Sequence, residues 1–201
     1  GLQVISVART ADALRALAQQ VPGIRACAAN IGDDSAIDAI RAQIDAPVRM
    51  LVQGAGVATA GGVLDAPTAA ITDAVNIKVG GLLRLVRAAD QRLAKGSRIV
   101  AIGGHYGFEP SAYAATAGVA NAALANVVRQ LSWAYGPRGV TAHLVAPGPA
   151  DTERLRRVAT ARGAQDGIDT DAVLNQMRSE SAIGAFTTVS YTHLTLPTSD
   201  L

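Results

Sequence analysis

The stretch VRMLVQGAG, residues 48–56, decides the fold that this sequence predicts. Its first six residues form an apolar run of strand length, which favours a buried β-strand. A Gly-rich turn follows, and a helical pattern with apolar residues on one face then runs to Lys95-Gly96. The order strand, turn, helix is the repeating unit of a parallel sheet.

The same alternation continues on both sides of this stretch. Apolar runs of four to eight residues are each followed by segments with apolar residues at helical spacing. Strands that alternate with helices pair in parallel, so the predicted fold class is α/β with an open, doubly wound parallel sheet. We expect strands at residues 4–8, 24–28, 48–53, 97–103 and 140–148, and helices at about 11–21, 33–44, 68–93, 113–135, 152–161 and 169–178.

Composition excludes several classes of protein. The chain has 201 residues, of which 49% are hydrophobic and 17% charged, and this balance excludes a disordered chain. The net charge of +2 comes from scattered arginines, so no nucleic-acid partner is expected. No apolar run is long enough to span a membrane, and the single Cys27 permits no internal disulfide. We therefore expect a cytoplasmic protein without a membrane or metal site.

The two ends of the sequence differ from the rest. The stretch VSYTHLTLPTSDL, residues 189–201, lacks helical period and arginine, and its first codons fit a transposase-type sequencing adaptor. We expect residues 189–201 to be a non-native tail; the alternative is a genuine polar tail with a short strand at 189–196. The chain also opens directly in a strand without a methionine, which predicts a fragment. The expected organisation is one partial domain over residues 1–188.

Five strand-end stretches, in this order, resemble the short-chain dehydrogenase/reductase family: VART, LVQGAGV, VNIKVGG, SRIVAIGG with YAATA, and HLVAPGPADT. The resemblance covers Gly1 to about Thr152. It implies a Rossmann-type NAD(P)-binding domain, truncated because the first strand-helix unit and the C-terminal end are missing. The family's Gly-rich phosphate turn would lie upstream of Gly1. Its first strand would lie in the middle of the sheet, between the strands at 4–8 and 48–53.

The resemblance also assigns the cofactor contacts. Arg9 would face the adenosine ribose, where a guanidinium favours the 2′-phosphate of NADP; NAD is the alternative, and a solvated arginine is the plain reading. Asn30 stands where the family has an aspartate beside the adenine. Small residues after the third strand would let the backbone approach the cofactor. The residues assigned to the cofactor are Arg9, Thr10, Asn30, Ile31, Gly54, Ala55, Gly56, Pro147, Gly148 and Thr152.

The resemblance gives an incomplete catalytic set. Tyr113 aligns with the family's proton-transferring tyrosine and Asn76 with the asparagine that holds a relay water. The lysine that follows the tyrosine by one helical turn is Ala117, and the serine at the strand end is Gly104. A cation about 4 Å away contributes roughly 4 kcal/mol at an effective dielectric constant of about 20, so the loss of the lysine matters.

Other polar residues are candidates to replace the missing serine and lysine. His105 is the best candidate for substrate contact, with Ser111 second, although a histidine at a strand end is more often solvated. Lys78 would point roughly 200° from Asn76 on a regular helix, and Lys95 lies at a helix end. We therefore expect neither lysine to take part.

Three hypotheses follow for the function. The first is a short-chain-type oxidoreductase with a degenerate catalytic set that acts on a small carbonyl or alcohol. The alternative is a non-catalytic NAD(P)-binding pseudo-enzyme or sensor, and the third is a fragment without activity. The family's habit of pairing through its two long helices, here 68–93 and 113–135, implies a homodimer or homotetramer.

Overall fold

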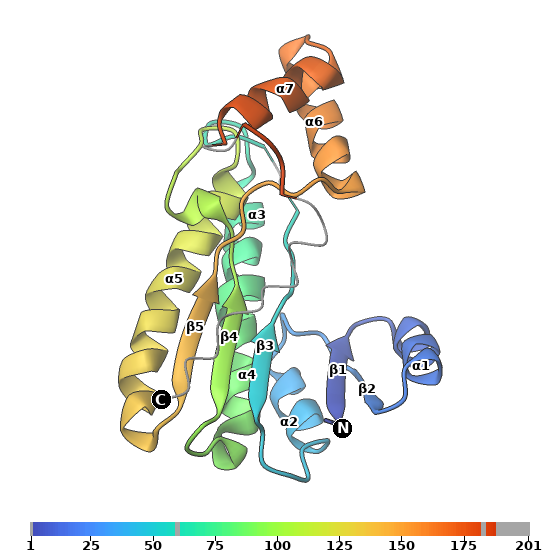
Figure 1. Ribbon diagram of the computed structural model, residues 1–201, viewed down its shortest axis with the longest axis vertical. Helices are drawn as coiled ribbons and strands as arrows, with labels where there is room; N and C mark the ends of the chain where they lie inside the picture. Colours follow the sequence, from blue (N-terminus) through green and yellow to red (C-terminus); the bar gives the residue numbers. More distant parts are fainter. Residues whose placement is uncertain (1, 59–60, 182–183, 188–201) are drawn as a thin grey trace. The chain divides into compact units, whose positions relative to one another are not determined.

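The computed structural model in Figure 1 describes residues 2–58, 61–181 and 184–187. The chain divides into two compact units, Gly1–Ala146 and Pro147–Leu201, and each is described by itself. The predicted tail at residues 189–201 lies outside the described residues. The extent of the predicted single domain stays a prediction.

The strands of the first unit confirm the predicted α/β class. They are β1 (Val4–Ala8), β2 (Ile24–Ala28), β3 (Met50–Gln53), β4 (Arg98–Ile102) and β5 (Thr141–Val145), and all of their pairings are parallel. The predicted strands at 4–8 and 24–28 match residue for residue. The other three are shorter than predicted: β3 begins two residues late, at Met50, and β4 and β5 begin one residue late and also end before the predicted ends.

The strands form two separate sheets, one with the order β1-β2 and one with the order β3-β4-β5. Within the described residues, β1 pairs only with β2 and β3 pairs only with β4. One edge of β1 and one edge of β3 are therefore open. This arrangement agrees with the expectation that a central strand is missing between them.

The helices of the first unit follow the strands in the predicted order. The helical segments are α1 (Ala11–Gln20), α2 (Ser35–Arg41), α3 (Thr68–Val75), the π-helical η1 (Asn76–Gly80), α4 (Gly81–Ala89), α5 (Ala115–Tyr135) and the short 3-10 turns η2 (Asp90–Arg92), η3 (His105–Gly107) and η4 (Gly136–Arg138). The predicted helix at 68–93 is thus interrupted by a π-helical turn. The predicted helix at 113–135 starts two residues late, at Ala115.

A hydrophobic core joins α4 and α5 to the three-stranded sheet. Leu82 of α4, Ile99 of β4 and Leu124 of α5 are completely buried in it. A second cluster packs Cys27 of β2 and Ile40 of α2 against α4. α4 therefore holds both sheets of the first unit.

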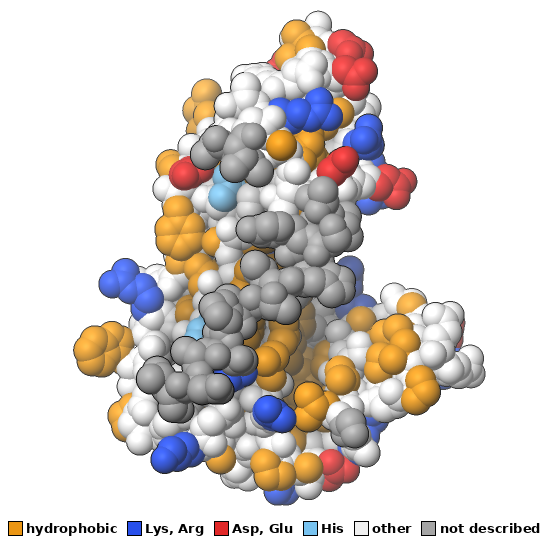
Figure 2. All heavy atoms as spheres, viewed as in Figure 1, with side chains coloured by type: hydrophobic (Ala, Val, Ile, Leu, Met, Phe, Trp, Pro, Cys, Tyr) orange, Lys and Arg blue, Asp and Glu red, His pale blue; other side chains and the backbone are white. Residues whose placement is uncertain are grey.

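The side chains of β3 alternate between a buried face and an exposed face. Leu51 and Gln53 are buried, whereas Met50 is 50% and Val52 is 52% exposed. Strands of parallel sheets are normally covered on both faces. Figure 2 shows hydrophobic side chains at the surface in the strand region of the first unit.

The second unit contains two helices, α6 (Glu153–Asp166) and α7 (Thr170–Ser179). Their apolar faces bury Ala159, Val173 and Met177. A bridge between Ala150 and Thr187 closes the unit. Both helices were predicted, and α6 ends five residues later than expected, at Asp166, where Gly167 follows in the left-handed conformation.

Candidate functional site

The carboxyl ends of β3 and β4 lie side by side. Gln53, the last residue of β3, is the register partner of Ala101, and Ile102 ends β4 one residue later. The Gly-rich stretch 54–56 leaves β3 here, and Gly103 and Gly104 leave β4. In open parallel sheets ligands bind at this edge of the strands. The predicted site residues of these loops are therefore brought together.

Gln53 connects β3 to the π-helical turn η1. Its side chain is completely buried, and its Nε2 donates to the carbonyl of Ile77 at 3.1 Å. Its Oε1 has no hydrogen-bond partner in the described part of the chain. A buried amide oxygen without a partner is costly unless a ligand or water reaches it.

Lys78 of η1 also reaches this edge. The side chain is only 6% exposed, and its Nζ donates to the carbonyl of Ile102 at 2.8 Å. Asn76, two residues earlier, contacts a different element, the loop after β2. The opposite directions of the two side chains were predicted. Lys78 was expected to take no part in the site; its side of the helix meets the end of β4, so it lies at the strand end that the proposal below concerns.

Two tyrosines meet next to the end of β4. The hydroxyl groups of Tyr106 in η3 and of Tyr113 are hydrogen-bonded, and the two rings pack edge to face with centroids 5.6 Å apart. The ring of His105 lies against Tyr106, with centroids 3.9 Å apart. Tyr113 and His105 were predicted as site residues, but Tyr106 was not. Its position one residue after His105 was the only signal for it in the sequence.

Glycines bring η3 close to α5. A Cβ on Gly107 would lie 2.8 Å from the backbone carbon of Asn121 and 2.9 Å from the backbone nitrogen of Ala122. Asn121 is 7% exposed, and its Oδ1 has no hydrogen-bond partner among the described residues. The predicted set did not include Asn121. The close approach fixes the backbone that carries Tyr106.

The spacing of Tyr113 and Ala117 does not have the predicted meaning. Tyr113 precedes α5, which begins at Ala115, so the four-residue spacing does not place the two on one helical face. The start of α5 is held by Thr116, whose hydroxyl donates to the carbonyl of Ala58 at 3.1 Å. Ala58 belongs to the loop after β3, so this bond ties that loop to the segment that carries Tyr113.

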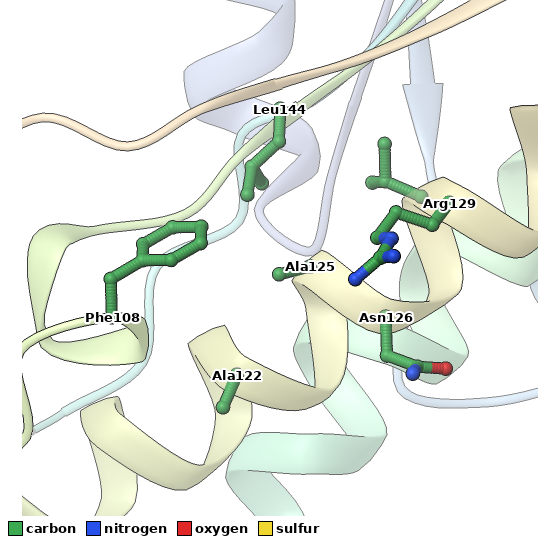
Figure 3. A pocket seen from close by; sticks show the side chains of 7 residues that line it. Phe108, Ala122, Ala125, Asn126, Arg129 and Leu144 are labelled. Carbon is green, nitrogen blue, oxygen red and sulfur yellow. The ribbon is translucent and has the colours of Figure 1, made fainter.

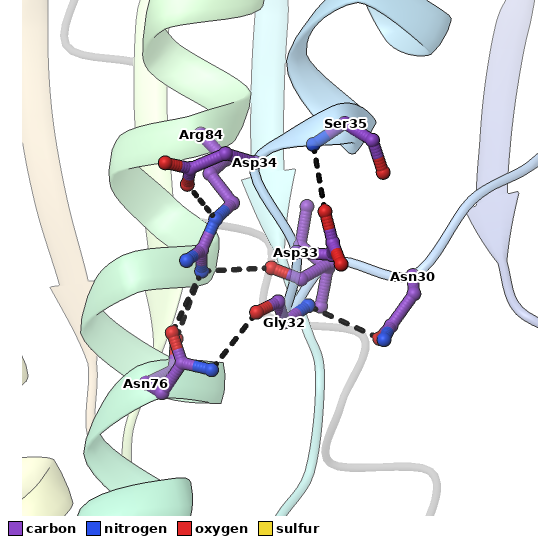
Figure 4. Close-up of polar contacts among 8 residues, drawn as sticks. Asn30, Gly32, Asp33, Asp34, Ser35, Asn76 and Arg84 are labelled. Atoms are coloured by element: carbon purple, nitrogen blue, oxygen red, sulfur yellow. Dashed lines mark hydrogen bonds and ion pairs between the residues drawn. The ribbon is translucent and has the colours of Figure 1, made fainter.

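The loop between β2 and α2 forms a second polar cluster (Figure 4). The side-chain oxygen of Asn30 accepts the backbone N–H of Gly32 at 3.2 Å. The amide nitrogen of Asn76 donates to the carbonyl of Gly32 at 2.9 Å, and its amide oxygen accepts from Arg84 at 2.9 Å. Asn76, predicted to act with Tyr113, thus has both amide atoms engaged at this loop. Its catalytic role stays a prediction.

The end of β1 adjoins the same loop. The backbone N–H of Ala29 donates to the carbonyl of Ala8 at 3.0 Å, which places Arg9 and Thr10 next to the stretch that starts with Asn30. Arg9 and Thr10 are both exposed. A guanidinium and an amide at adjoining strand ends are a donor set that fits a nucleotide with an adenine and a ribose phosphate.

The electrostatics of this loop favour an ionised Asp33. The backbone N–H of Ser35, followed by the Ser35 hydroxyl, holds the pKa of the Asp33 carboxyl below its ordinary value. The backbone hydrogen bond measures 2.9 Å. This pairing caps the first turn of α2 and keeps the negative charge at the helix N-terminus.

Three predicted cofactor residues lie in the second unit. The hydroxyl of Thr152 accepts the backbone N–H of Leu155 at 3.2 Å and so caps α6. Pro147 and Gly148 precede it in a segment without regular structure, and a Cβ on Gly148 would meet open space. Their role at the cofactor stays a prediction.

A separate cavity of about 440 Å³ lies between η3, β5 and α5 (Figure 3). It contains none of the predicted site residues. Most of its lining is apolar, and Arg129 and Asn126 are its polar members. The lining residues are Phe108, Ala122, Ala125, Asn126, Val128, Arg129 and Leu144.

Within the described residues, no group of three or more His, Cys, Asp or Glu side chains is placed to hold a metal ion. Likewise, none of the helices in this part of the chain is both long and apolar enough to cross a membrane.

Comparison with known proteins gives a family match and curated relatives. Residues 1–189 match the family model described as enoyl-(acyl carrier protein) reductase. The cyclic-di-GMP-binding biofilm dispersal mediator protein of Escherichia coli is 29% identical over 143 residues, which are 71% of this chain and 60% of that protein. The 3-oxoacyl-(acyl-carrier-protein) reductase MabA of Mycobacterium avium is 29% identical over 132 residues, or 63% of this chain and 52% of that protein. The chain therefore spans little more than half the length of these relatives.

Solved structures share the fold. A mutant short-chain dehydrogenase/reductase of Serratia marcescens is 25% identical, with a TM-score of 0.77 over 94% of this chain and 76% of that one. NAD+-bound xylitol dehydrogenase has a TM-score of 0.81 at 16% identity, covering 94% of this chain and 78% of that chain. L-Sorbose reductase of Gluconobacter frateurii, solved with NADPH and L-sorbose, has a TM-score of 0.77 at 19% identity, covering 94% and 76%.

Proposed function

The chain belongs to the short-chain dehydrogenase/reductase family, and we propose that it is an NAD(P)-dependent oxidoreductase that acts on a small carbonyl or alcohol. One observation carries the proposal. The hydroxyls of Tyr113 and Tyr106 meet beside the carboxyl end of β4, where a parallel sheet offers its ligand site. Each phenol has one O–H, so both can donate to one carbonyl oxygen when that oxygen replaces their mutual hydrogen bond.

The hydrogen-bond donors and small residues at these strand ends fit a nicotinamide cofactor. Arg9 would bind the 2′-phosphate of NADP, and Asn30 with Ile31 would lie against the adenine; NAD is the alternative. Gly54, Ala55 and Gly56 would let the backbone approach the middle of the cofactor. The nicotinamide contacts that the family resemblance implies for Pro147, Gly148 and Thr152 stay a prediction. When bound, this group supplies or accepts a hydride.

The chain's own residues then handle the oxygen and its proton. Tyr113 would give its phenolic proton to the carbonyl oxygen as negative charge develops there during reduction. Tyr106 supplies the second hydrogen bond to this oxygen, in the role that the family gives to the serine replaced by Gly104. The ammonium of Lys78 adds a positive charge at the same strand end, where negative charge develops. His105 contacts the substrate from the side of Tyr106.

Binding and turnover measurements test this proposal. The product of the intact gene is titrated with NADPH and NADH by fluorescence and then assayed against a panel of aldehydes, ketones and alcohols. Saturable binding with turnover of at least one compound supports the oxidoreductase. Saturable binding without turnover across the panel would replace it by the second candidate.

The second candidate is a non-catalytic nucleotide-binding protein. It is favoured by the loss of the family's serine and lysine, at Gly104 and Ala117, and by the relative from Escherichia coli that is named as a cyclic-di-GMP-binding protein. The same titration with cyclic-di-GMP, alone and in competition with NADPH, discriminates the two. Binding of cyclic-di-GMP with no hydride transfer would favour this candidate.

We also propose that the protein is a homodimer or homotetramer that pairs through α5 and the α3–α4 segment. Val119 and Trp133 of α5 are 48% and 85% exposed and lie fourteen residues apart, which places them on one face of the helix. Light scattering of the intact product and of Trp133→Asp tests this. Unchanged mass in the variant would contradict pairing through this face.

A further inference from the structure

Arg84 of α4 holds the loop between β2 and α2 in one conformation. Its Nε donates to Oδ1 of Asp34 at 2.7 Å, and one terminal nitrogen donates to the carbonyl of Ile31 at 3.0 Å. The same nitrogen donates to the amide oxygen of Asn76 at 2.9 Å (Figure 4). One guanidinium therefore connects two points of the loop to the π-helical turn.

The glycines on both sides leave room for this arrangement. A Cβ on Gly80 would lie 2.6 Å from a terminal nitrogen of Arg84 and 2.8 Å from the amide oxygen of Asn76. A Cβ on Gly32 would lie 2.9 Å from Cδ1 of Ile77. A side chain at Gly32 would push the loop away from the helix, and one at Gly80 would displace the Arg84 guanidinium and the Asn76 amide. The absence of a Cβ at Gly80 thus leaves the space that the Arg84 guanidinium occupies.

Burial makes these bonds stronger than those of a surface arginine. The Arg84 side chain is 13% exposed, although its partner Asp34 is 75% exposed. Hydrogen bonds from a charged donor in a partly desolvated place are about twice as strong as neutral ones. Arg84 is therefore more important for the loop conformation than the exposed ion pair alone would suggest.

The loop that Arg84 holds carries Asn30 and Ile31, the two residues proposed at the adenine. Oδ1 of Asn30 accepts the N–H of Gly32, so the geometry of Gly32 decides how the Asn30 amide is turned. The carbonyl of Gly32 is in turn held by Asn76, and that of Ile31 by Arg84. The bonds from Asn76 and Arg84 form only while the loop lies against the helix. They hold the backbone of Ile31 and Gly32, and the bond from Gly32 then orients the Asn30 amide.

We propose that Arg84, with Asn76 as its helical partner, is a positioning residue for the adenosine half of the cofactor. The inference rests on the proposed nicotinamide cofactor. Arg84 acts through the loop and not by contact with the nucleotide. By the same contacts, the side chain of Asn76 has a role in cofactor affinity that is separate from the chemistry at Tyr113.

Arg138 provides a matched control. Its guanidinium donates to Oδ1 of Asp90 at 2.6 Å and to the carbonyls of Asp90 and Leu93 at 2.8 and 2.9 Å. It thus makes a comparable number of bonds to a carboxylate and to backbone oxygens. These bonds lie at the η2 and η4 turns and involve no residue of the β2–α2 loop.

The test is calorimetric binding of ADP-ribose, which contains the adenosine half and lacks the nicotinamide. With the intact gene product, Arg84→Gln is expected to weaken ADP-ribose binding by about tenfold or more, since charged hydrogen bonds that fix the site are lost. The KM for NADPH rises by a similar factor, while kcat at saturating NADPH stays unchanged. Arg84→Lys, which keeps the charge but cannot reach all three acceptors, gives a smaller loss. Arg138→Gln lowers the melting temperature but leaves the ADP-ribose affinity unchanged.

Equal ADP-ribose affinities for wild type, Arg84→Gln and Arg138→Gln would overturn the inference while leaving the cofactor proposal standing. A fall in kcat with unchanged affinity would overturn it as well. If Arg84→Gln does not fold, Gly80→Ala carries the test, because its Cβ displaces the guanidinium, and it should weaken ADP-ribose binding in the same way. A wild-type protein that binds neither ADP-ribose nor NADPH contradicts the proposed function itself.

Discussion

At the scale of single residues, the hydroxyl pair of Tyr106 and Tyr113 is the feature with the most direct chemical consequence. Tyr113→Phe removes the proposed acid and should lower kcat for carbonyl reduction by about 10²- to 10⁴-fold, the usual range for a general acid. Tyr106→Phe should lower kcat by about 10²- to 10³-fold, the effect of one lost donor to the developing oxyanion. The measurement is steady-state kinetics at saturating NADPH.

The double variant distinguishes a working pair from two independent residues. Because both hydroxyls serve one oxygen, the losses should be less than multiplicative in Tyr106→Phe/Tyr113→Phe. Binding of NADPH and the melting temperature should stay close to wild type in all three variants. Fully multiplicative losses, or an unchanged kcat in Tyr106→Phe, would contradict the assignment of Tyr106.

Tyr135 gives a prediction for stability against pH. Burial, followed by the hydrogen bond to Asp90, raises the pKa of Tyr135 to about 12, and the hydroxyl lies 2.6 Å from the carboxylate. A phenol in the unfolded chain titrates near 10, so the folded state binds the proton more tightly. Its contribution to stability is therefore fully present below pH of about 10 and is lost as the pH rises towards 12.

Tyr135→Phe tests this dependence. Below pH of about 10 the variant should be less stable than wild type by about 1 kcal/mol, the net value of a side-chain hydrogen bond. The difference in the free energy of unfolding, measured in urea, should shrink as the pH is raised from 10 to 12. A difference that is constant from pH 8 to pH 12 would show that the Asp90 contact does not depend on the phenolic proton.

At the scale of elements, the contact of η3 with α5 depends on Gly107. An added Cβ would lie within 3 Å of backbone atoms of Asn121 and Ala122, and a helical backbone has little freedom to retreat. Gly107→Ala should therefore move Tyr106 from Tyr113, lower kcat at least as much as Tyr106→Phe and cost about 1–3 kcal/mol of stability. Kinetics and urea unfolding measure the two effects.

Gly136→Ala is the control for this substitution. A Cβ on Gly136 meets nothing within 4 Å, and its φ of −52° suits alanine. This variant should keep its kcat and be as stable as wild type or slightly more stable, because alanine restricts the unfolded chain. Equal effects of the two substitutions would mean that the close approach at Gly107 has no special role.

The elements also show which features the sequence can predict. The apolar runs 4–8 and 24–28 were predicted residue for residue because a buried strand needs only a short apolar segment between turn residues. The π-helical turn at Asn76–Gly80 was not predicted, because the apolar spacing does not reveal the bonds that its carbonyls accept from Gln53, 24 residues away, and from Arg84 of the next helix. A regular helical period was therefore assumed through residues 68–93.

The candidate site was predictable to a similar degree. Strand ends are visible in the sequence, so Tyr113, His105 and the Gly-rich stretch 54–56 were found. Tyr106 was not among the predicted residues, and Lys78 was expected to take no part, because the contacts of their side chains are not visible in the sequence. Sequence spacing gives the direction of Lys78 on its helix, but it does not reveal that the end of β4 lies on that side.

At the scale of the whole molecule, the sheets of the first unit leave apolar surface and strand edges uncovered. Met50 and Val52 are about half exposed on one face of β3, and β1 and β3 each have an open edge within the described residues. Open edges and apolar faces favour association between chains. The 201-residue chain expressed alone should bind a dye specific for apolar surface and form large assemblies in light scattering.

Met50→Thr/Val52→Thr should reduce the dye signal, because both exposed side chains become polar while the buried Leu51 and Gln53 are kept. The core-facing substitution Leu51→Ala is the contrast and should raise the signal by loosening the core. A 201-residue chain that stays monomeric and binds no dye would contradict this description of the uncovered face.

Hydride transfer at the carboxyl ends of β3 and β4 can be followed with an isotope. The intact gene product is incubated with NADPH that carries deuterium at the transferring position and with a panel of small carbonyl compounds, and the products are analysed by mass spectrometry. We expect an alcohol that has gained one deuterium with the wild-type protein, and at most about one hundredth of that rate with Tyr113→Phe. Tight NADPH binding without deuterium in any product, or equal transfer by Tyr113→Phe, would contradict this expectation.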